Sequence, residues 1–344
     1  MNKMIIHYCG GAGINISKKI HSELANLGEG FCEVEPRYID TSVNNIGGLP
    51  PELLWKIDSS GFSEGEIAGS GGERRTNSTE IVEDMKKYLD THGHTDEVTS
   101  EFHVVVFSAS GGTGSIVAPT IMSNLRTRNI PVLGVVIGDS GNGLSCKNTL
   151  NTIATLDHMS KTGIKKPMVI IYYNNHNAVA EGAKDREDLV NSKILSALTI
   201  TSLFLSGDNE DIDTKDMINF LAPDNYNTIS IAPSLYCINM HIAGEVTNNK
   251  EHINLIGRTL SCPKDHANLD LVLLQHKYGM VTSQNAIDKM DELTPIHVVL
   301  AGNCLVEEHK ALKNTVAEYT AIMDGISTAT LEGTGDADDS GMVF

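Results

Sequence analysis

Short apolar runs alternate with segments of helical periodicity along the first half of the chain. The helical spacing is clearest over residues 15–27, where apolar side chains recur four and three residues apart. Five runs are predicted strands: residues 4–9, 34–40, 102–108, 131–137 and 167–173. Because most of them are uniformly apolar and alternate with helices, they predict a parallel sheet covered by helices on both faces.

A long helix is predicted over residues 185–206, and its apolar side chains surround most of the circumference, which indicates burial. The segments after it predict a smaller α/β domain with strands at 228–240, 269–274 and 296–301 and a helix at 305–323. We expect four units: an N-terminal domain at 1–184, the central helix at 185–206, a C-terminal domain at 207–327 and an acidic tail at 328–344.

Composition narrows the class of protein. The 344 residues are 40% apolar and 20% charged, as in a globular protein, and the net charge of −18 disfavours direct binding to nucleic acid or an anionic membrane. The six cysteines form no CxxC pair, so no zinc site is expected, and they suit a reducing compartment. No apolar stretch of 18 residues and no signal peptide is present, and we therefore expect a cytoplasmic protein.

Two glycine-rich loops each follow a predicted strand and precede a predicted helix. Gly10, Gly11, Ala12 and Gly13 form the first loop. Glycine lets backbone N–H groups turn inward, and these groups attract phosphate at the start of a helix. The first loop alone fits either a phosphate site or a turn for close helix packing.

The second loop is more specific, because it combines three glycines and three hydroxyls in six residues after a buried strand. Its residues are Ser110, Gly111, Gly112, Thr113, Gly114 and Ser115. It is neither a Walker A loop, which ends in Lys-Ser/Thr, nor the G-x-G-x-x-G loop of a Rossmann fold. We expect it to bind phosphate.

The motif Ser110–Ser115 resembles the signature loop of the tubulin/FtsZ family, although Ile116 stands where that family has a further glycine. The family's other loops have counterparts in the same order. The segment Gly10–Asn15 resembles the first loop, Asp40 matches the acid of the second, and Gly69-Ser70-Gly71-Gly72 resembles the third. The resemblance implies GTP/GDP with Mg²⁺ as the bound nucleotide, on Gly10–Gly13, Asn15, Asp40, Gly71, Gly72 and Ser110–Ser115.

The resemblance extends to the base end of the nucleotide. Asn174 ends a predicted strand and Asn191 lies in the long helix, where the family places side chains beside the guanine ring. An amide can pair with guanine or with adenine. Asp139 and Asn142 follow the strand at 131–137, where the resemblance implies a ribose contact.

An acidic loop at 207–216 follows the long helix. Its segment Asp211–Asp216 resembles the family's N-x-D-x-x-D motif, which reaches into the next subunit and orients the attacking water. The resemblance implies that Asp213 and Asp216 are catalytic; a register shift to Asn209 and Asp211, or a merely solvated loop, are the alternatives.

The length, the divergent signature loop and the acidic tail resemble the phage and plasmid tubulins in particular. The resemblance implies a GTPase that polymerises with copies of itself, with a tail that contacts the neighbouring subunit and an adaptor that links the filament to phage or plasmid DNA. Two alternatives remain. One is a homologue that binds nucleotide without turnover. The other is a Rossmann-type NAD(P) oxidoreductase, although Asp40 lies far from Gly10 for that motif.

Overall fold

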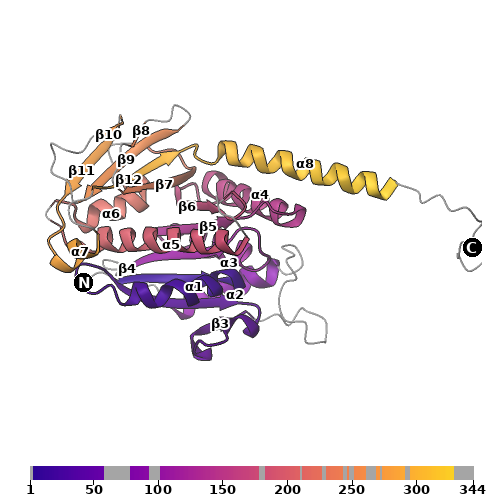
Figure 1. The fold of residues 1–344 in the computed structure, drawn as a ribbon, viewed down its shortest axis with the longest axis horizontal. Coiled ribbons are helices and arrows are strands. Elements are labelled where there is room, and N and C mark those ends of the chain that lie inside the picture. The colour runs from indigo at the N-terminus through magenta and orange to yellow at the C-terminus, as the bar shows by residue number, and fades with distance from the viewer. Residues whose placement is uncertain are drawn as a thin grey trace, which may run out of the picture.

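Ten strands form one mixed sheet in the computed structural model, in the order β11-β9-β12-β7-β6-β5-β4-β1-β2-β3 (Figure 1). The structure describes residues 3–57, 78–92, 101–177, 183–209, 211–226, 230–242, 246–247, 252–260, 269–271, 273–290 and 295–328. The strands of this sheet are β1 (Lys3–Cys9), β2 (Glu33–Asp40), β3 (Leu54–Lys56), β4 (Glu101–Ser108), β5 (Val132–Gly138), β6 (Met168–Asn174), β7 (Leu235–Ile242), β9 (Ile253–Leu260), β11 (Gln275–Gly279) and β12 (Ile296–Gly302). Strands β8 (Val246–Thr247) and β10 (Leu269–Asp270) form a separate parallel pair.

Helices cover both faces of the sheet, as the sequence predicts. They are α1 (Gly10–Ala25), α2 (Ser78–Thr91), α3 (Gly114–Thr127), α4 (Gly143–His158), α5 (Ala183–Ser206), α6 (Thr214–Leu221), α7 (Gln284–Lys289) and α8 (Val306–Thr328). One apolar core joins α1, α5 and α6 to alternate strand residues such as Met4, Ile6 and Tyr8. The other core joins α2, α3 and α4 to the opposite face of the same strands.

The N-terminal half is parallel throughout. Strand β1 lies between β2 and β4 and is parallel to both, and β4, β5 and β6 continue the parallel order. The chain therefore reverses its direction of winding between β1 and β4. In open α/β sheets, ligands bind beyond the carboxyl ends of the strands at such a point.

Helix α5 crosses the molecule beside α1 and joins the two halves (Figure 1). Its length and composition alone would suffice to span a membrane, but 56% of the relevant residues are buried inside the protein, as in a core helix. Apolar side chains such as Ile194, Leu198 and Phe204 lie in the main core. The prediction of a buried helix is confirmed.

The C-terminal half extends the same sheet. Strand β7 pairs with β6 in parallel and with β12 in antiparallel, and β9 pairs with β12 in antiparallel. Because hydrogen bonds run through β6 and β7, the sheet does not break between the halves. The division at residues 184 and 206 stays a prediction.

The structure differs from the predicted elements in several places. Helix α1 begins at Gly10, directly after β1, because Gly10 adopts a φ of +73° that reverses the chain within one residue. Strands β8, β9 and β11 and the short helices α6 and α7 were not predicted, since each is short or lacks a clear periodicity. The short strand β3 was not predicted either. Among the described residues of the predicted strand at 269–274, only β10 (Leu269–Asp270) is a strand.

Histidines in the C-terminal sheet predict a loss of stability in acid. The hydroxyl of Thr259 lies 2.9 Å from Nε2 of His276 and 2.9 Å from Nδ1 of His297. Burial, with His297 and Arg258 nearby, lowers the pKa of His276 to about 4. A lowered folded-state pKa means that stability is full above the unfolded value of about 6.5 and is lost as pH falls toward 4.

We expect the free energy of unfolding to fall by about 1 kcal/mol from this histidine between pH 7 and 4.5, a value reduced because the side chain is half-exposed. Denaturant titrations at both pH values measure it. In His276→Gln the decrease should be smaller, whereas His158→Gln, at an exposed position on α4, should behave like wild type. Equal pH dependence in all three proteins would contradict the assignment.

Candidate nucleotide site

The two glycine loops meet at the carboxyl ends of β1 and β4. Each loop leads directly into a helix, the first into α1 and the second into α3. The two helices contact each other. A Cβ on Gly10 would lie 2.8 Å from the backbone nitrogen of Gly114, and a Cβ on Gly114 would lie 2.7 Å from the carbonyl oxygen of Cys9. Glycine at both positions therefore lets the two helix starts touch.

A cavity of about 140 Å³ opens at this junction. It is lined by Cys9, Gly10, Gly11, Ala12, Asp40, Thr41, Ser42, Asn45, Ser108, Gly111, Gly112, Thr113 and Gly114. The positive ends of two helix dipoles and the N–H groups of two glycine loops face one space. No lysine or arginine is among these lining residues, so an anion would be held by backbone groups and hydroxyls.

Asp40 forms the acidic wall of this cavity and is only 2% exposed. Its carboxylate accepts hydrogen bonds from the Thr41 backbone N–H (2.8 Å) and from Nδ2 of Asn45 (2.7 Å). Burial raises the pKa of Asp40, and these hydrogen bonds oppose the rise. One carboxylate beside hydroxyls and a phosphate site suits Mg²⁺, which binds proteins through few carboxylates and through the substrate's phosphates.

A second cavity of about 190 Å³ adjoins the first and shares Ala12 and Ser108 with it. It is lined by Ala12, Asn15, Ile16, Lys19, Ser108, Ile137, Asn175, Glu187, Val190 and Asn191. Three amides and a carboxylate next to apolar walls can pair with the edge of a base whose faces pack against carbon. The two cavities together have the chemistry of a nucleotide site. We call the first the phosphate cavity and the second the base cavity, after the part of a nucleotide that each would suit.

The acidic loop lies at the other end of α5. Asn191 lines the base cavity, and Ser206 ends the helix 15 residues later, about 22 Å away at the helical rise. Asp213 caps α6, where its side chain accepts from the Asp216 N–H (2.8 Å) and the Asp216 side chain accepts from the Asp213 N–H (3.2 Å). Asp213 is exposed, whereas Asp216 is 7% exposed and pairs with Lys277 at 2.6 Å.

These two acids therefore differ in surroundings. The fully buried guanidinium of Arg258 lies 3.8 Å from Asp216 and donates to Gln275 and Tyr226. The Asp216 carboxylate lies between the cationic side chains of Arg258 and Lys277, whereas Asp213 is exposed to solvent at the surface of the loop. Asn209 accepts hydrogen bonds from the Ile212 and Asp211 N–H groups, so its side chain is used to shape the loop.

The structure resembles known filament proteins over nearly its whole length. The phage tubulin PhuZ in a GDP complex has a TM-score of 0.75 at 19% identity, with 99% of each chain covered. The protofilament of TubZ from bacteriophage PhiKZ has a TM-score of 0.74 at 20% identity, with the same coverage. These likenesses fix the fold.

The sequence comparison agrees with the fold. The "Phage tubulin-like protein" of Pseudomonas phage phiKZ is 25% identical over 224 residues, which span 63% of this chain and 62% of that protein. Its namesake from Pseudomonas phage 201phi2-1 is 23% identical over 225 residues. No protein-family model matches the sequence. The chain has the tubulin-like fold of these phage proteins and resembles them in sequence.

Most predicted nucleotide contacts of this tubulin-like chain lie at the two cavities. Gly10, Gly11, Ala12, Asp40 and Gly111–Gly114 line the phosphate cavity, and Asn15 and Asn191 line the base cavity. Gly13 lines neither cavity and packs against β4, where a Cβ would lie 2.7 Å from the Val106 carbonyl oxygen. Ser110, the first residue of the second loop, lines neither cavity, and its hydroxyl pairs with that of Ser108 (2.8 Å). Gly71 and Gly72 lie outside the described residues. Their roles as nucleotide contacts remain predictions.

Four predicted residues point elsewhere in the tubulin-like fold. Ser115 donates to the Gly112 carbonyl (3.1 Å) on the far side of the loop. Asn174 donates to Glu308 of α8 (2.6 Å) instead of lining the base cavity, and its successor Asn175, in the turn after β6, lines that cavity. Asp139 accepts from the Gly141 N–H and Asn142 caps α4, and neither lines either cavity.

Several lining residues were missed by the sequence analysis. Thr41, Ser42 and Asn45 lie within five residues after Asp40, and the position of this largely polar segment at a strand end could have signalled them. Asn175 adjoins the predicted Asn174, and Glu187 lies one helical turn before Asn191. Their side chains reach the cavities because of strand pleat and helix phase.

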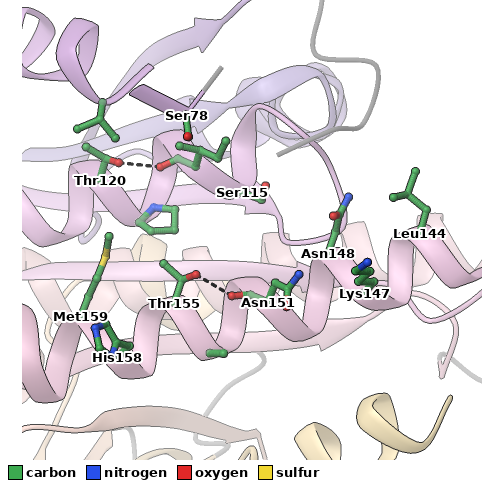
Figure 2. A pocket seen from close by; sticks show the side chains of 14 residues that line it. Ser78, Ser115, Thr120, Leu144, Lys147, Asn148, Asn151, Thr155, His158 and Met159 are labelled. Atoms are coloured by element: carbon green, nitrogen blue, oxygen red, sulfur yellow. Dashed lines mark hydrogen bonds between the residues drawn. The ribbon is translucent and has the colours of Figure 1, made fainter. Parts of the chain in front are cut away.

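A larger groove of about 820 Å³ lies behind the signature loop of the tubulin-like chain, between α3 and α4 (Figure 2). Figure 2 shows Ser115 and Thr120 from α3 facing Asn148, Asn151 and Thr155 from α4. Asn148 also donates to the Ser110 carbonyl (2.9 Å). The groove therefore shares Ser115 with the second glycine loop, but it is separate from the phosphate cavity.

The base cavity yields a direct prediction. Asn191→Leu removes one amide partner, and we expect guanine nucleotide to bind about 5- to 10-fold more weakly, the value of one hydrogen bond. Fluorescence or calorimetric titration with GDP measures it. Ser192→Ala, at the next and exposed position of α5, is the matched control. An unchanged dissociation constant for Asn191→Leu would remove this side chain from the nucleotide contacts.

Proposed function

We propose that this protein binds and hydrolyses GTP and polymerises into filaments, and that each active site is completed by the next subunit. One observation carries the proposal: the exposed acid Asp213 lies at the opposite end of α5 from the nucleotide cavity of its own chain. Because α5 runs about 22 Å from Asn191 to its end at Ser206, before the loop that carries Asp213, this acid would not reach a nucleotide in that cavity. Head-to-tail stacking of subunits would bring the acidic loop of one against the cavity of the next.

Related structures support guanine nucleotide and self-association. One neighbour is the phage tubulin PhuZ with GDP, and another is a protofilament of Bacillus thuringiensis TubZ in a GTPγS form, with a TM-score of 0.65 at 12% identity over 95% of each chain. We extend both properties to this chain as proposals. Mg²⁺ would be held near Asp40 by the phosphates.

Different residues would have different roles in GTP hydrolysis. The N–H groups of Gly111–Gly114 and the start of α3 would stabilise the negative charge that builds on the terminal phosphoryl group. Asp213 of the adjoining subunit would orient the attacking water and accept its proton. Asp216, paired with Lys277, positions the Asp213 backbone through the capping box. Nucleotide turnover would therefore follow assembly.

We further propose that the tail strengthens the filament. Helix α8 leads away from the body, with Ile322 and Met323 exposed near its end (Figure 1). The tail beyond it is acidic with an apolar tip, and the groove between α3 and α4 is largely apolar and contains the exposed Lys147. The tail of one subunit in the groove of its neighbour would match both features. Such a filament, in the host cytoplasm, would position phage or plasmid DNA through an adaptor.

Removal of residues 329–344 should raise the critical concentration for polymerisation by about 10-fold or more, the loss of about 1.4 kcal/mol per contact. The charge reversal Lys147→Glu in the groove should also raise the critical concentration for polymerisation. Lys310→Glu, an exposed lysine of α8, is the matched control. Sedimentation with GTPγS measures the threshold, and GDP binding by the monomer should stay unchanged in all three. Equal thresholds would contradict the tail contact.

The deciding experiment measures phosphate release against protein concentration, with GTP and ATP in parallel and with light scattering. A threshold concentration, preference for GTP and rising scattering are expected. Turnover that is linear from the lowest concentration without scattering would exclude a site shared between subunits. GTP binding without turnover would favour the non-hydrolysing alternative.

A further inference from the structure

Helix α8 contacts both loops that follow the strands nearest the base cavity. Its Tyr319 hydroxyl donates to the carbonyl of Gly141 (3.4 Å) in the loop after β5, and the Tyr319 ring lies 3.2 Å from where a Cβ on Gly143 would be. Near its start, Glu308 contacts the turn at 174–177 after β6. Leu312, between them on the same helix face, is buried against α4.

Glu308 is the acceptor for three side chains at the end of β6. Its Oε1 accepts from the Tyr172 hydroxyl (2.8 Å) and from Nδ2 of Asn174 (2.6 Å), and its Oε2 lies 3.5 Å from Nδ2 of Asn177. Burial, reinforced by the Glu308 charge, raises the pKa of Tyr172 well above its ordinary value. The phenol therefore stays protonated and donates to the carboxylate.

These bonds fix the direction of the turn. Oδ1 of Asn174 accepts from the His176 N–H (2.9 Å), and the Asn175 N–H donates to the Gly138 carbonyl (3.0 Å). Asn174, the last residue of β6, points toward Glu308, and Asn175, the first residue of the turn, lines the base cavity. The amide that faces the base is thus oriented by a carboxylate on the far helix.

We propose that Glu308 is a positioning residue of the nucleotide site, which holds the 174–177 turn in its binding geometry and thereby couples base binding to the seating of α8. The proposal rests on the proposed guanine-nucleotide site and adds a regulatory link to it. An occupied base cavity would hold Asn175 in place and favour the Glu308 contacts. By reciprocity, a displaced α8 would weaken nucleotide binding by the same factor.

The test is GDP binding by the monomeric full-length chain, with hydrogen exchange of α8 measured in the same samples. Glu308→Ala should raise the dissociation constant for GDP about 5-fold or more, as a lost multidentate contact would. Glu308→Gln keeps the Oε1 acceptor for Tyr172 and Asn174 and should stay within about twofold of wild type. Glu307→Ala, the exposed neighbour that pairs with Lys310, is the matched control and should bind GDP normally.

Hydrogen exchange separates positioning from loss of stability. In wild type, GDP should slow exchange in the first turns of α8 several-fold, and Glu308→Ala should abolish that response while the exchange of β4 and β5 stays slow. GDP binding by Glu308→Ala equal to wild type, or the same GDP effect on α8 in both, overturns the coupling. A wild-type chain that binds no GDP overturns the proposed function itself, and the coupling with it.

Discussion

Asp213→Asn should abolish GTP turnover in filaments while GTP binding and assembly remain. Asparagine caps a helix as well as aspartate does, so α6 and the loop keep their structure, and only the negative charge is lost. A carboxylate that orients water and accepts its proton contributes about 100- to 10,000-fold in rate. We therefore expect phosphate release to fall at least 100-fold at protein concentrations well above the polymerisation threshold.

Two further variants separate charge from capping. Asp213→Ala should lose both turnover and about 1 kcal/mol of stability through the missing cap. Lys215→Ala, an exposed position in the first turn of α6, is the control and should hydrolyse GTP at the wild-type rate. Filaments of Asp213→Asn should also persist after assembly, since their nucleotide is not consumed. Turnover near wild type in Asp213→Asn would show that this carboxylate serves only as a helix cap.

Gly10→Ala should strongly weaken nucleotide binding by disturbing both glycine loops at once. The residue has a φ of +73°, a conformation that costs a non-glycine residue about 1–2 kcal/mol. The new Cβ would also lie 2.8 Å from the Gly114 nitrogen, where α3 begins. Because one helix start must move away from the other, we expect GDP to bind at least about 10-fold more weakly and stability to fall by about 1–3 kcal/mol.

Two glycines provide the comparison. A Cβ on Gly111 would meet nothing closer than 3.9 Å, but Gly111 lines the phosphate cavity, so Gly111→Ala should weaken GDP binding with little change in stability. Gly47→Ala has open space and lies outside the loops, and both quantities should stay at wild-type values. Calorimetric titration and thermal unfolding measure the two effects. Normal GDP affinity in Gly10→Ala would contradict the arrangement of the loops.

The sequence predicted the parts of the site that depend on local chemistry. A buried strand followed by glycines and a helix specifies its own conformation, because φ and hydrogen bonding at Gly10 and Gly114 are decided within a few residues. The acidic loop was recognisable for the same reason, since its cap and its acids lie within Asp213–Asp216. The confirmed parallel sheet followed from runs of apolar residues that need cover on both faces.

Other features depend on residues far apart in the sequence. Residues 174 and 175 are both asparagine, so the sequence does not show which of them lines the base cavity. The contact of Asn174 with Glu308, 134 residues away, distinguishes the two. The partners of Asp216 come from β9 and β11, and β6–β7 pairing makes one sheet of the two halves. Local pattern therefore determined which loops carry the chemistry. Tertiary packing alone determined which side chains face the cavities and that Asp213 lies far from the cavities of its own chain, because those distances depend on how the elements are placed in space.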